Sequence, residues 1–107
     1  MTKNSDLDFD SLTESLRDFA RGRDWEKFHS PKNLAMAVAG ETGELVAEFQ
    51  WLSSEESHRS SLSEDKMQSI AMEIADVQIY LLRLADVLGV DIPTAVKQKM
   101  RINEERF

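Results

Sequence analysis

The sequence predicts an all-α protein made of a single domain, residues 1–107. Only four residues are glycine and two are proline, and no stretch shows the alternation of apolar and polar residues that is typical of a strand. Apolar residues instead recur at three- and four-residue spacing in four segments, as in helices that bury one face. Because a chain of 107 residues, 41% of them hydrophobic, buries only a modest core, we expect it to assemble as a homo-oligomer.

The first helix is expected over about residues 11–23. Ser11 and Glu14 have the spacing of a capping box. An apolar stripe follows them: Leu12, Leu16, Phe19 and Ala20. Residues 1–10 are expected to be a flexible tail, and they lack the basic and apolar blocks of a signal peptide.

The second helix opens at Ser30, a preferred capping residue, with Pro31 in the first helical position. We expect it to end near Trp51. Its apolar positions are Leu34, Ala37, Val38, Leu45 and Phe49. Residues 53–63 are rich in serine and have no long apolar stretch, which indicates a flexible or partly helical connector.

The third helix, over about residues 64–88, is the longest and is the expected spine of the fold. Gly89 is its predicted stop. The last helix is capped by Asp91, tolerates Pro93 in its first turn and continues to the C-terminus. The apolar positions of these two helices include Met67, Ile70, Ile74, Val77, Leu81, Leu84, Leu88, Val96, Met100 and Ile102.

Composition excludes several kinds of function. The chain has no cysteine, which rules out a disulfide scaffold, a thiolate zinc site and a cysteine nucleophile. Its net charge of −7 argues against a nucleic acid polymer as partner. No apolar run approaches the roughly 20 residues that cross a bilayer, so we expect a cytoplasmic protein with no membrane partner. A small anionic ligand fits this charge if metal cations bridge it to acidic side chains.

Acidic residues fall where the second helix should be apolar. On a helical wheel, Glu41 and Glu48 lie within its apolar arc and Glu44 lies at the edge of that arc. An ionised carboxylate in apolar surroundings is strongly unfavourable unless it has a partner. The chain must therefore supply or bind compensating positive charge at this face.

The third helix carries a matching pair, Glu73 and Asp76, at i, i+3 spacing on the shoulder of its apolar face. Two such pairs on neighbouring helices would form an all-oxygen cage, which suits Mg²⁺ or Mn²⁺ better than zinc. Two other interpretations compete with this one. The carboxylates can be solvated or paired with Lys or Arg, and a weaker alternative is a ferritin-like di-iron site built from Glu-x-x-His motifs.

Two stretches resemble the divided acidic motif of the MazG-like pyrophosphohydrolases. They are residues 39–45, Ala-Gly-Glu-Thr-Gly-Glu-Leu, and residues 73–77, Glu-Ile-Ala-Asp-Val. Where the family's fuller pattern has a leading glutamate, this chain has Gly40. Residues 23–34, 49–51 and 99–103 are similar to the dCTP pyrophosphatase branch of that family, so that the likeness extends from about Asp18 to Arg106.

The resemblance implies a four-helix MazG-like bundle module that assembles as a homotetramer, a dimer of dimers. It also implies Mg²⁺-dependent hydrolysis of nucleoside triphosphates, dCTP or related pyrimidine deoxynucleotides first among them, to the monophosphate and pyrophosphate. One of the carboxylates would accept the proton of the attacking water. The implied metal ligands are Glu41, Glu44, Glu73 and Asp76. The implied residues around the nucleotide are Trp25, His29, Trp51, Tyr80, Lys99 and Asn103.

Other interpretations stay open on the sequence. Apart from the resemblance, the aromatic residues fit an ordinary core, His29 fits a loop, and Lys99 and Asn103 fit a solvated helix face. The same chemistry can act on purine or damaged nucleotides. The chain also fits a non-catalytic helical interaction module, whose carboxylates would be solvated or paired. The sequence assigns no role to Glu48.

Overall fold

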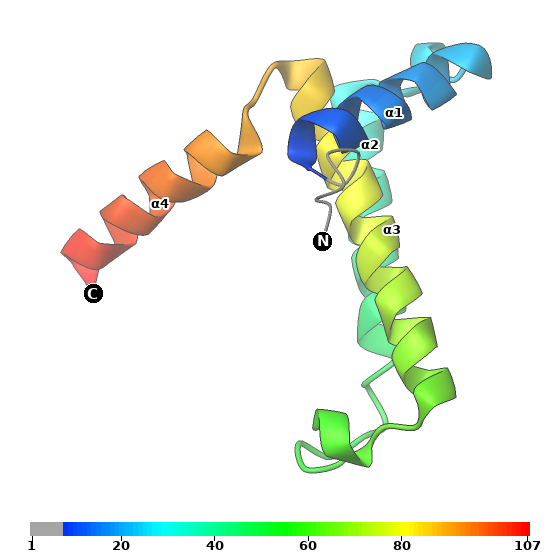
Figure 1. The fold of residues 1–107 in the computed structure, drawn as a ribbon, viewed down its shortest axis with the longest axis vertical. Helices are drawn as coiled ribbons and strands as arrows, with labels where there is room; N and C mark the ends of the chain where they lie inside the picture. Colours follow the sequence, from blue (N-terminus) through cyan, green and yellow to red (C-terminus); the bar gives the residue numbers. More distant parts are fainter. Residues whose placement is uncertain (1–7) are drawn as a thin grey trace, which may run out of the picture.

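The computed structural model describes residues 8–107, and this part of the chain contains helices and turns but no strand (Figure 1). The elements follow in this order: α1 (Phe9–Gly22), η2 (Glu26–Phe28), α2 (Pro31–Ala47), η3 (Arg59–Ser61), α3 (Glu64–Leu88) and α4 (Ile92–Arg106), where η denotes a short 3-10 helix. The all-α prediction and the four expected helices are confirmed. None of these helices is both long and apolar enough to cross a membrane.

Two predicted caps and one predicted stop are confirmed. The side chains of Ser30 and Asp91 accept hydrogen bonds from the backbone N–H groups of Asn33 and Thr94, at 3.2 and 3.1 Å. Each bond satisfies a donor that the first helical turn leaves without a partner. Gly89 ends α3 with φ +74°, a left-handed conformation that glycine adopts without the strain of a Cβ atom.

The predicted start of the first helix at Ser11 is wrong. Asp8 is the capping residue, and its Oδ1 accepts a hydrogen bond from the backbone N–H of Ser11 at 2.7 Å. Asp caps a helix as well as Ser does, and the earlier start adds Phe9 to the apolar face. Phe9 and Asp10 therefore belong to α1 and not to the expected tail. Residues 1–7 of that tail lie outside the described residues.

The second helix ends at Ala47, before the predicted end near Trp51. The backbone N–H groups that follow bond to carbonyl oxygens three residues back, a tighter pattern that is frequent where helices end. Ser53 and Glu56 then exchange two hydrogen bonds, at 2.8 and 3.2 Å, which start a new turn. Because η3 follows, the expected connector over residues 53–63 is partly helical.

α3 is the helix against which α1 and α2 pack. α2 lies alongside it, and α1 crosses it near its C-terminal end (Figure 1). Few apolar side chains of the described part are fully buried, which agrees with the modest core expected from the chain length. They are Ala20, Leu34, Ile70 and Leu82.

α4 is separate from this three-helix body. It extends to one side in Figure 1 and packs closely against none of the other helices. Its apolar residues Val96, Met100 and Ile102 keep 49%, 57% and 44% of their surface exposed. The chain therefore has the four helices of the expected module, but by itself it packs only three of them together.

Candidate active site

Three of the predicted carboxylates come together where α2 and α3 pack. Glu41 of α2 and Glu73 and Asp76 of α3 each offer a carboxylate oxygen, and these oxygens lie within 4.8 Å of one another. The i, i+3 spacing places Glu73 and Asp76 on one side of α3, and the packing of the two helices brings Glu41 to them. We call these residues the acidic trio. All three side chains are half-buried.

Negative charge is concentrated in the acidic trio. Partial desolvation raises the pKa of Glu73 above its usual value, and the charges of Asp76, Glu44, Glu41 and, last, Glu48 raise it further. This direction means that the ionised form of Glu73 is disfavoured here. A bound cation would relieve the repulsion.

The other two acidic residues of α2 are arranged differently. Glu44 is exposed and lies outside the trio, although its charge still acts on Glu73. Glu48 forms an ion pair with Nζ of Lys66 at 3.0 Å. Glu48, to which the sequence assigns no role, thus has a cationic partner on α3. The competing interpretation, in which the carboxylates are paired with Lys or Arg, holds for this residue.

A pocket of about 360 Å³ lies beside the acidic trio. Its wall combines two members of the trio with aromatic, apolar and basic side chains from α1, α3 and the segment before α2. The lining residues are Leu16, Phe19, Ala20, Trp25, His29, Glu41, Asp76, Ile79, Tyr80 and Arg83. We call it the aromatic pocket. The structure therefore places the sequence-predicted Trp25, His29 and Tyr80 next to the carboxylates.

The turn after α1 positions Trp25. Asp24 adopts a left-handed conformation with φ +57°, which Asp tolerates better than most residues. The chain then reverses, so that the backbone N–H of Trp25 donates to the carbonyl of Ala20 at 2.9 Å. The Trp25 ring meets Phe19 edge-on at 5.4 Å between centroids and lies 6.5 Å from the His29 ring. These contacts hold the indole in the lining of the pocket.

Three sequence-predicted residues do not line the pocket of their own chain. Trp51 lies in the turns after α2 with 87% of its surface exposed. Lys99 and Asn103 lie on α4, which does not pack closely against the helices that form the pocket, and neither residue is part of its lining. Within one chain, the structure therefore assembles only part of the expected nucleotide site.

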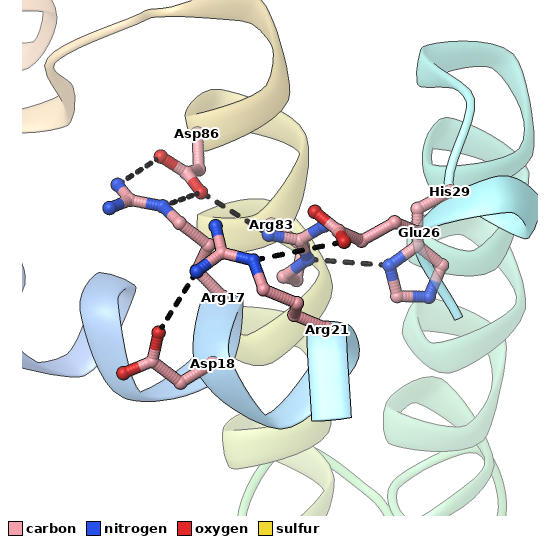
Figure 2. Close-up of polar contacts among 7 residues, drawn as sticks. All are labelled: Arg17, Asp18, Arg21, Glu26, His29, Arg83 and Asp86. Atoms are coloured by element: carbon pink, nitrogen blue, oxygen red, sulfur yellow. Dashed lines mark hydrogen bonds and ion pairs between the residues drawn. The ribbon is translucent and has the colours of Figure 1, made fainter. Parts of the chain in front are cut away.

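Polar contacts link His29 to three residues that the sequence did not single out, Arg17, Arg83 and Asp86 (Figure 2). Arg17 of α1 donates to both carboxylate oxygens of Asp86 on α3, at 2.9 and 2.7 Å. Arg83 donates from Nη1 to the same carboxylate at 3.2 Å and from Nε to Nδ1 of His29 at 3.3 Å. The sequence contains one sign of this network: Arg83 and Asp86 are charged residues at i, i+3 spacing within the leucine-rich stripe of α3, the same spacing as in the acidic pairs.

The network shifts the pKa of three of its members. Hydrogen bonds from Arg17 lower the pKa of Asp86, and the same contact raises that of Arg17. Partial burial, followed by the charge of Arg83, lowers the pKa of His29, which favours a neutral ring.

The ferritin-like alternative does not fit this arrangement. The chain contains two Glu-x-x-His sequences, at residues 26–29 and 55–58, and both lie outside α2 and α3. A di-iron centre takes these motifs from the helices that face each other in a bundle.

The chain is similar to known proteins in sequence and in fold. Residues 37–107 match the model of the MazG-like family. dCTP pyrophosphatase 1 of Homo sapiens is 44% identical over 90 residues, which cover 84% of this chain and 53% of that protein. Its Rattus norvegicus counterpart is 43% identical over 90 residues, with the same coverage of 84% and 53%. The chain thus spans about half the length of the curated relatives it matches. A crystal structure of a pyrophosphatase from Archaeoglobus fulgidus is similar with a TM-score of 0.86 and 38% identity, covering 100% of this chain and 98% of the other.

Proposed function

Because the chain belongs to the MazG-like family, we propose that it is a Mg²⁺-dependent nucleoside triphosphate pyrophosphohydrolase that acts on dCTP or related pyrimidine deoxynucleotides. Water would attack the α-phosphorus, and the bond from that phosphorus to the bridging oxygen would break, which releases the monophosphate and pyrophosphate. The observation that carries the proposal is the acidic trio at the edge of the aromatic pocket. The likeness to the dCTP pyrophosphatases supports a deoxycytidine nucleotide as substrate.

The donor set of the trio fits Mg²⁺. It offers carboxylate oxygens alone, the ligand type that Mg²⁺ prefers. Among residues 8–107, none of the ion pairs includes Glu41, Glu73 or Asp76, so their charges are left for a cation. Glu44, one turn along α2 from Glu41, would complete a set of four ligands. Mg²⁺ held there would supply Lewis-acid polarisation of the phosphoryl oxygens.

The chain's own side chains would perform the remaining tasks. A pocket of about 360 Å³ falls in the usual range of small-molecule sites, and Trp25 and Tyr80 give it aromatic surface for a base. One carboxylate of the set would accept the proton that the attacking water loses. The partly enclosed wall would limit the access of bulk water to the base.

A second copy of the chain would complete the site. Trp51, Lys99 and Asn103 lie outside the pocket of their own chain, and α4 extends away from the body with its apolar side chains exposed. In the proposed homotetramer, a dimer of dimers, these residues would reach the pocket of a neighbouring subunit. Burial of the apolar residues of α4 would supply the favourable free energy for that contact.

A substrate panel tests the proposal. Pyrophosphate release is measured for the four common deoxynucleoside triphosphates, CTP and an oxidised purine nucleotide, each with Mg²⁺ and with a chelator. We expect Mg²⁺-dependent release, with the highest kcat/KM for dCTP. A preference for a purine or for the damaged nucleotide would move the proposal to that substrate. If no nucleotide releases pyrophosphate, the helical interaction module becomes the better interpretation.

A further inference from the structure

Arg83 is the one charged side chain that is buried in the described part of the chain, with 4% of its surface exposed. It extends from α3 towards His29 and lines the aromatic pocket (Figure 2). A buried guanidinium is unfavourable unless carboxylates compensate it. Here a single carboxylate, that of Asp86, serves both Arg83 and Arg17. Two guanidinium groups therefore share one carboxylate, and the ion pair that Arg17 and Asp86 form between α1 and α3 does not require Arg83.

The contact between Arg83 and His29 fixes where the imidazole carries its proton. Arg83 donates from Nε to Nδ1 of His29 at 3.3 Å. Arginine stays protonated in proteins and has no acceptor, so Nδ1 must be the nitrogen without a proton. In the neutral imidazole the proton then lies on Nε2. Protonation of Nδ1 would break this hydrogen bond and place two cations next to each other.

The surroundings of His29 favour that neutral ring. Partial burial and the charge of Arg83 lower its pKa, and Glu26 acts in the opposite direction. Among residues 8–107, Nε2 of His29 has no hydrogen-bond partner, and the ring lines the aromatic pocket. The other charged groups that face the pocket or the network come from all three packed helices: Arg17 of α1, Glu41 of α2, and Asp76 and Asp86 of α3.

We propose that Arg83 is a positioning residue of the pocket, which holds His29 as the neutral tautomer whose Nε2–H donates to an acceptor atom of the bound nucleoside. The identity of this ligand rests on the proposed function, whereas the tautomer is a property of the free protein. A nitrogen fixed as a donor favours ligands that present an acceptor, such as a pyrimidine carbonyl oxygen. It rejects ligands that present a donor at the same place, because that leaves two donors facing each other.

Nitrogen spectroscopy measures the proton position directly. Long-range ¹H–¹⁵N correlation spectra of the full chain, labelled at histidine, report the tautomer and the pKa of each ring. The chain has two histidines, and His58→Gln assigns the remaining signal to His29. We expect the Nε2–H tautomer and a pKa below the ordinary value of histidine. A ring that carries its proton on Nδ1 would overturn the inference.

Variants of Arg83 separate its charge from its hydrogen bond. In Arg83→Met, which removes both, the Nδ1–H tautomer should become populated and the pKa of His29 should rise. Arg83→Gln keeps a planar N–H donor without the charge, so the tautomer should persist while the pKa rises, and this variant also serves if Arg83→Met does not fold. Arg21→Met is the matched control, since Arg21 pairs with Asp18 and Glu26 and not with His29. If neither Arg83 variant changes the tautomer or the pKa, Arg83 does not position His29.

Kinetics test the contact with the nucleoside. With dCTP and Mg²⁺, Arg83→Met and His29→Ala should each raise KM about tenfold, the scale of one lost hydrogen bond, with little change in kcat. The double variant should be no worse than either single variant, because both remove the same interaction. An unchanged KM in Arg83→Met would overturn the contact. If the wild type hydrolyses no nucleotide, the proposed function fails, and the tautomer measurement still decides the link between Arg83 and His29.

Discussion

Glu73 shows how the fold changes the chemistry of a single carboxylate. On an isolated helix it would be an ordinary solvated acid, but here α2 approaches α3 and surrounds it with other negative charges. Its pKa rises because the ionised form is partly desolvated and repelled by neighbours. A cation bound among the trio would reverse that preference, so we expect metal binding and protonation to compete at this site.

Asp76→Asn tests the acidic trio. It removes one charged ligand and changes the shape of the side chain little, so we expect the Mg²⁺-dependent kcat/KM for dCTP to fall by about 100-fold or more. Circular dichroism should show a folded helical protein. Mg²⁺ should raise the melting temperature of the wild type more than that of the variant, because it binds the native state.

The matched control for this test is Asp65→Asn, since Asp65 is an exposed acid in the first turn of α3 and lies outside the trio. It should keep its activity and its response to Mg²⁺. Turnover near the wild-type value in Asp76→Asn would remove Asp76 from the proposed site.

Trp51→Ala and Trp25→Ala separate base stacking from packing. Trp51 is 87% exposed in the chain, whereas Trp25 is 43% exposed and its ring packs against that of Phe19. Loss of a base–aromatic contact is worth about 1–3 kcal/mol, so Trp51→Ala should raise KM for dCTP roughly tenfold to a hundredfold and leave kcat unchanged. Trp25→Ala should raise KM and also lower the melting temperature. An unchanged KM in Trp51→Ala would exclude Trp51 from the nucleotide site.

At the scale of helices, the sequence predicts that each helix exists more accurately than it predicts the residues at which the helix begins and ends. The periodic apolar stripes are local and identify all four helices. The start of a helix depends on which of several polar side chains accepts the capping hydrogen bond, and at α1 this residue is Asp8 and not the predicted Ser11. The end of a helix also depends on hydrogen bonds further along the chain, such as those between Ser53 and Glu56, which start a new turn after α2. Sequence spacing alone does not rank these competing contacts.

In the candidate site, too, some residues were predictable from the sequence and others were not. The acidic pairs were predictable because i, i+3 spacing on an apolar face is visible in the sequence. Arg83 was missed because its partners come from different parts of the chain: Asp86 belongs to its own helix, but Arg17 lies 69 residues from Asp86, and His29 lies 54 residues from Arg83. Such contacts depend on how α1 crosses α3, which periodicity does not specify.

Gly89→Ala tests the C-terminal end of α3. Apart from Gly89 and its two neighbours in the chain, no residue has an atom within 4 Å of a Cβ placed there, so the substitution is opposed by the backbone conformation at φ +74°. We expect a loss of about 1 kcal/mol in the free energy of unfolding, measured in urea. Gly22→Ala is the control, because Gly22 is helical and also has open space around it. It should leave stability unchanged or raise it by about 0.5–1 kcal/mol, and equal losses in both variants would contradict the argument.

Asp86→Asn tests the link between α1 and α3. Asp86 has its pKa lowered from 3.8 in the native state, mainly by Arg17, so its stabilising contribution is present above the unfolded pKa and is lost as pH falls through the native pKa. At pH 7 the variant should lose on the order of 1–3 kcal/mol of unfolding free energy, because two arginines lose a charged acceptor. The difference from the wild type should stay constant from about pH 5 to 7 and shrink below about pH 4. A difference that does not depend on pH would show that the carboxylate charge is not the cause.

At the scale of the whole molecule, α4 presents more apolar surface than one chain can bury. An apolar groove of about 480 Å³ lies where α3 meets α4, and its lining includes Leu84, Leu88, Val90, Ile92 and Val96. Exposed apolar patches of this kind are typical of protein–protein interfaces. A monomer with an independent α4 would also leave Lys99 and Asn103 away from any pocket. Assembly and activity are therefore expected to depend on the same surface.

Val96→Glu tests this dependence. A carboxylate in the apolar groove would be buried without a partner in the assembled form, which is strongly unfavourable, but it would remain solvated in a free chain. Light scattering should report a mass near four times 12.2 kDa for the wild type and a smaller mass for the variant. Gln98→Glu adds the same charge at an exposed position on the same helix, outside the groove, and should assemble normally. If the site takes Lys99 and Asn103 from a neighbour, activity should fall with assembly, and high protein concentration should restore both together. A monomeric Val96→Glu protein with full activity would show that one chain holds the whole site.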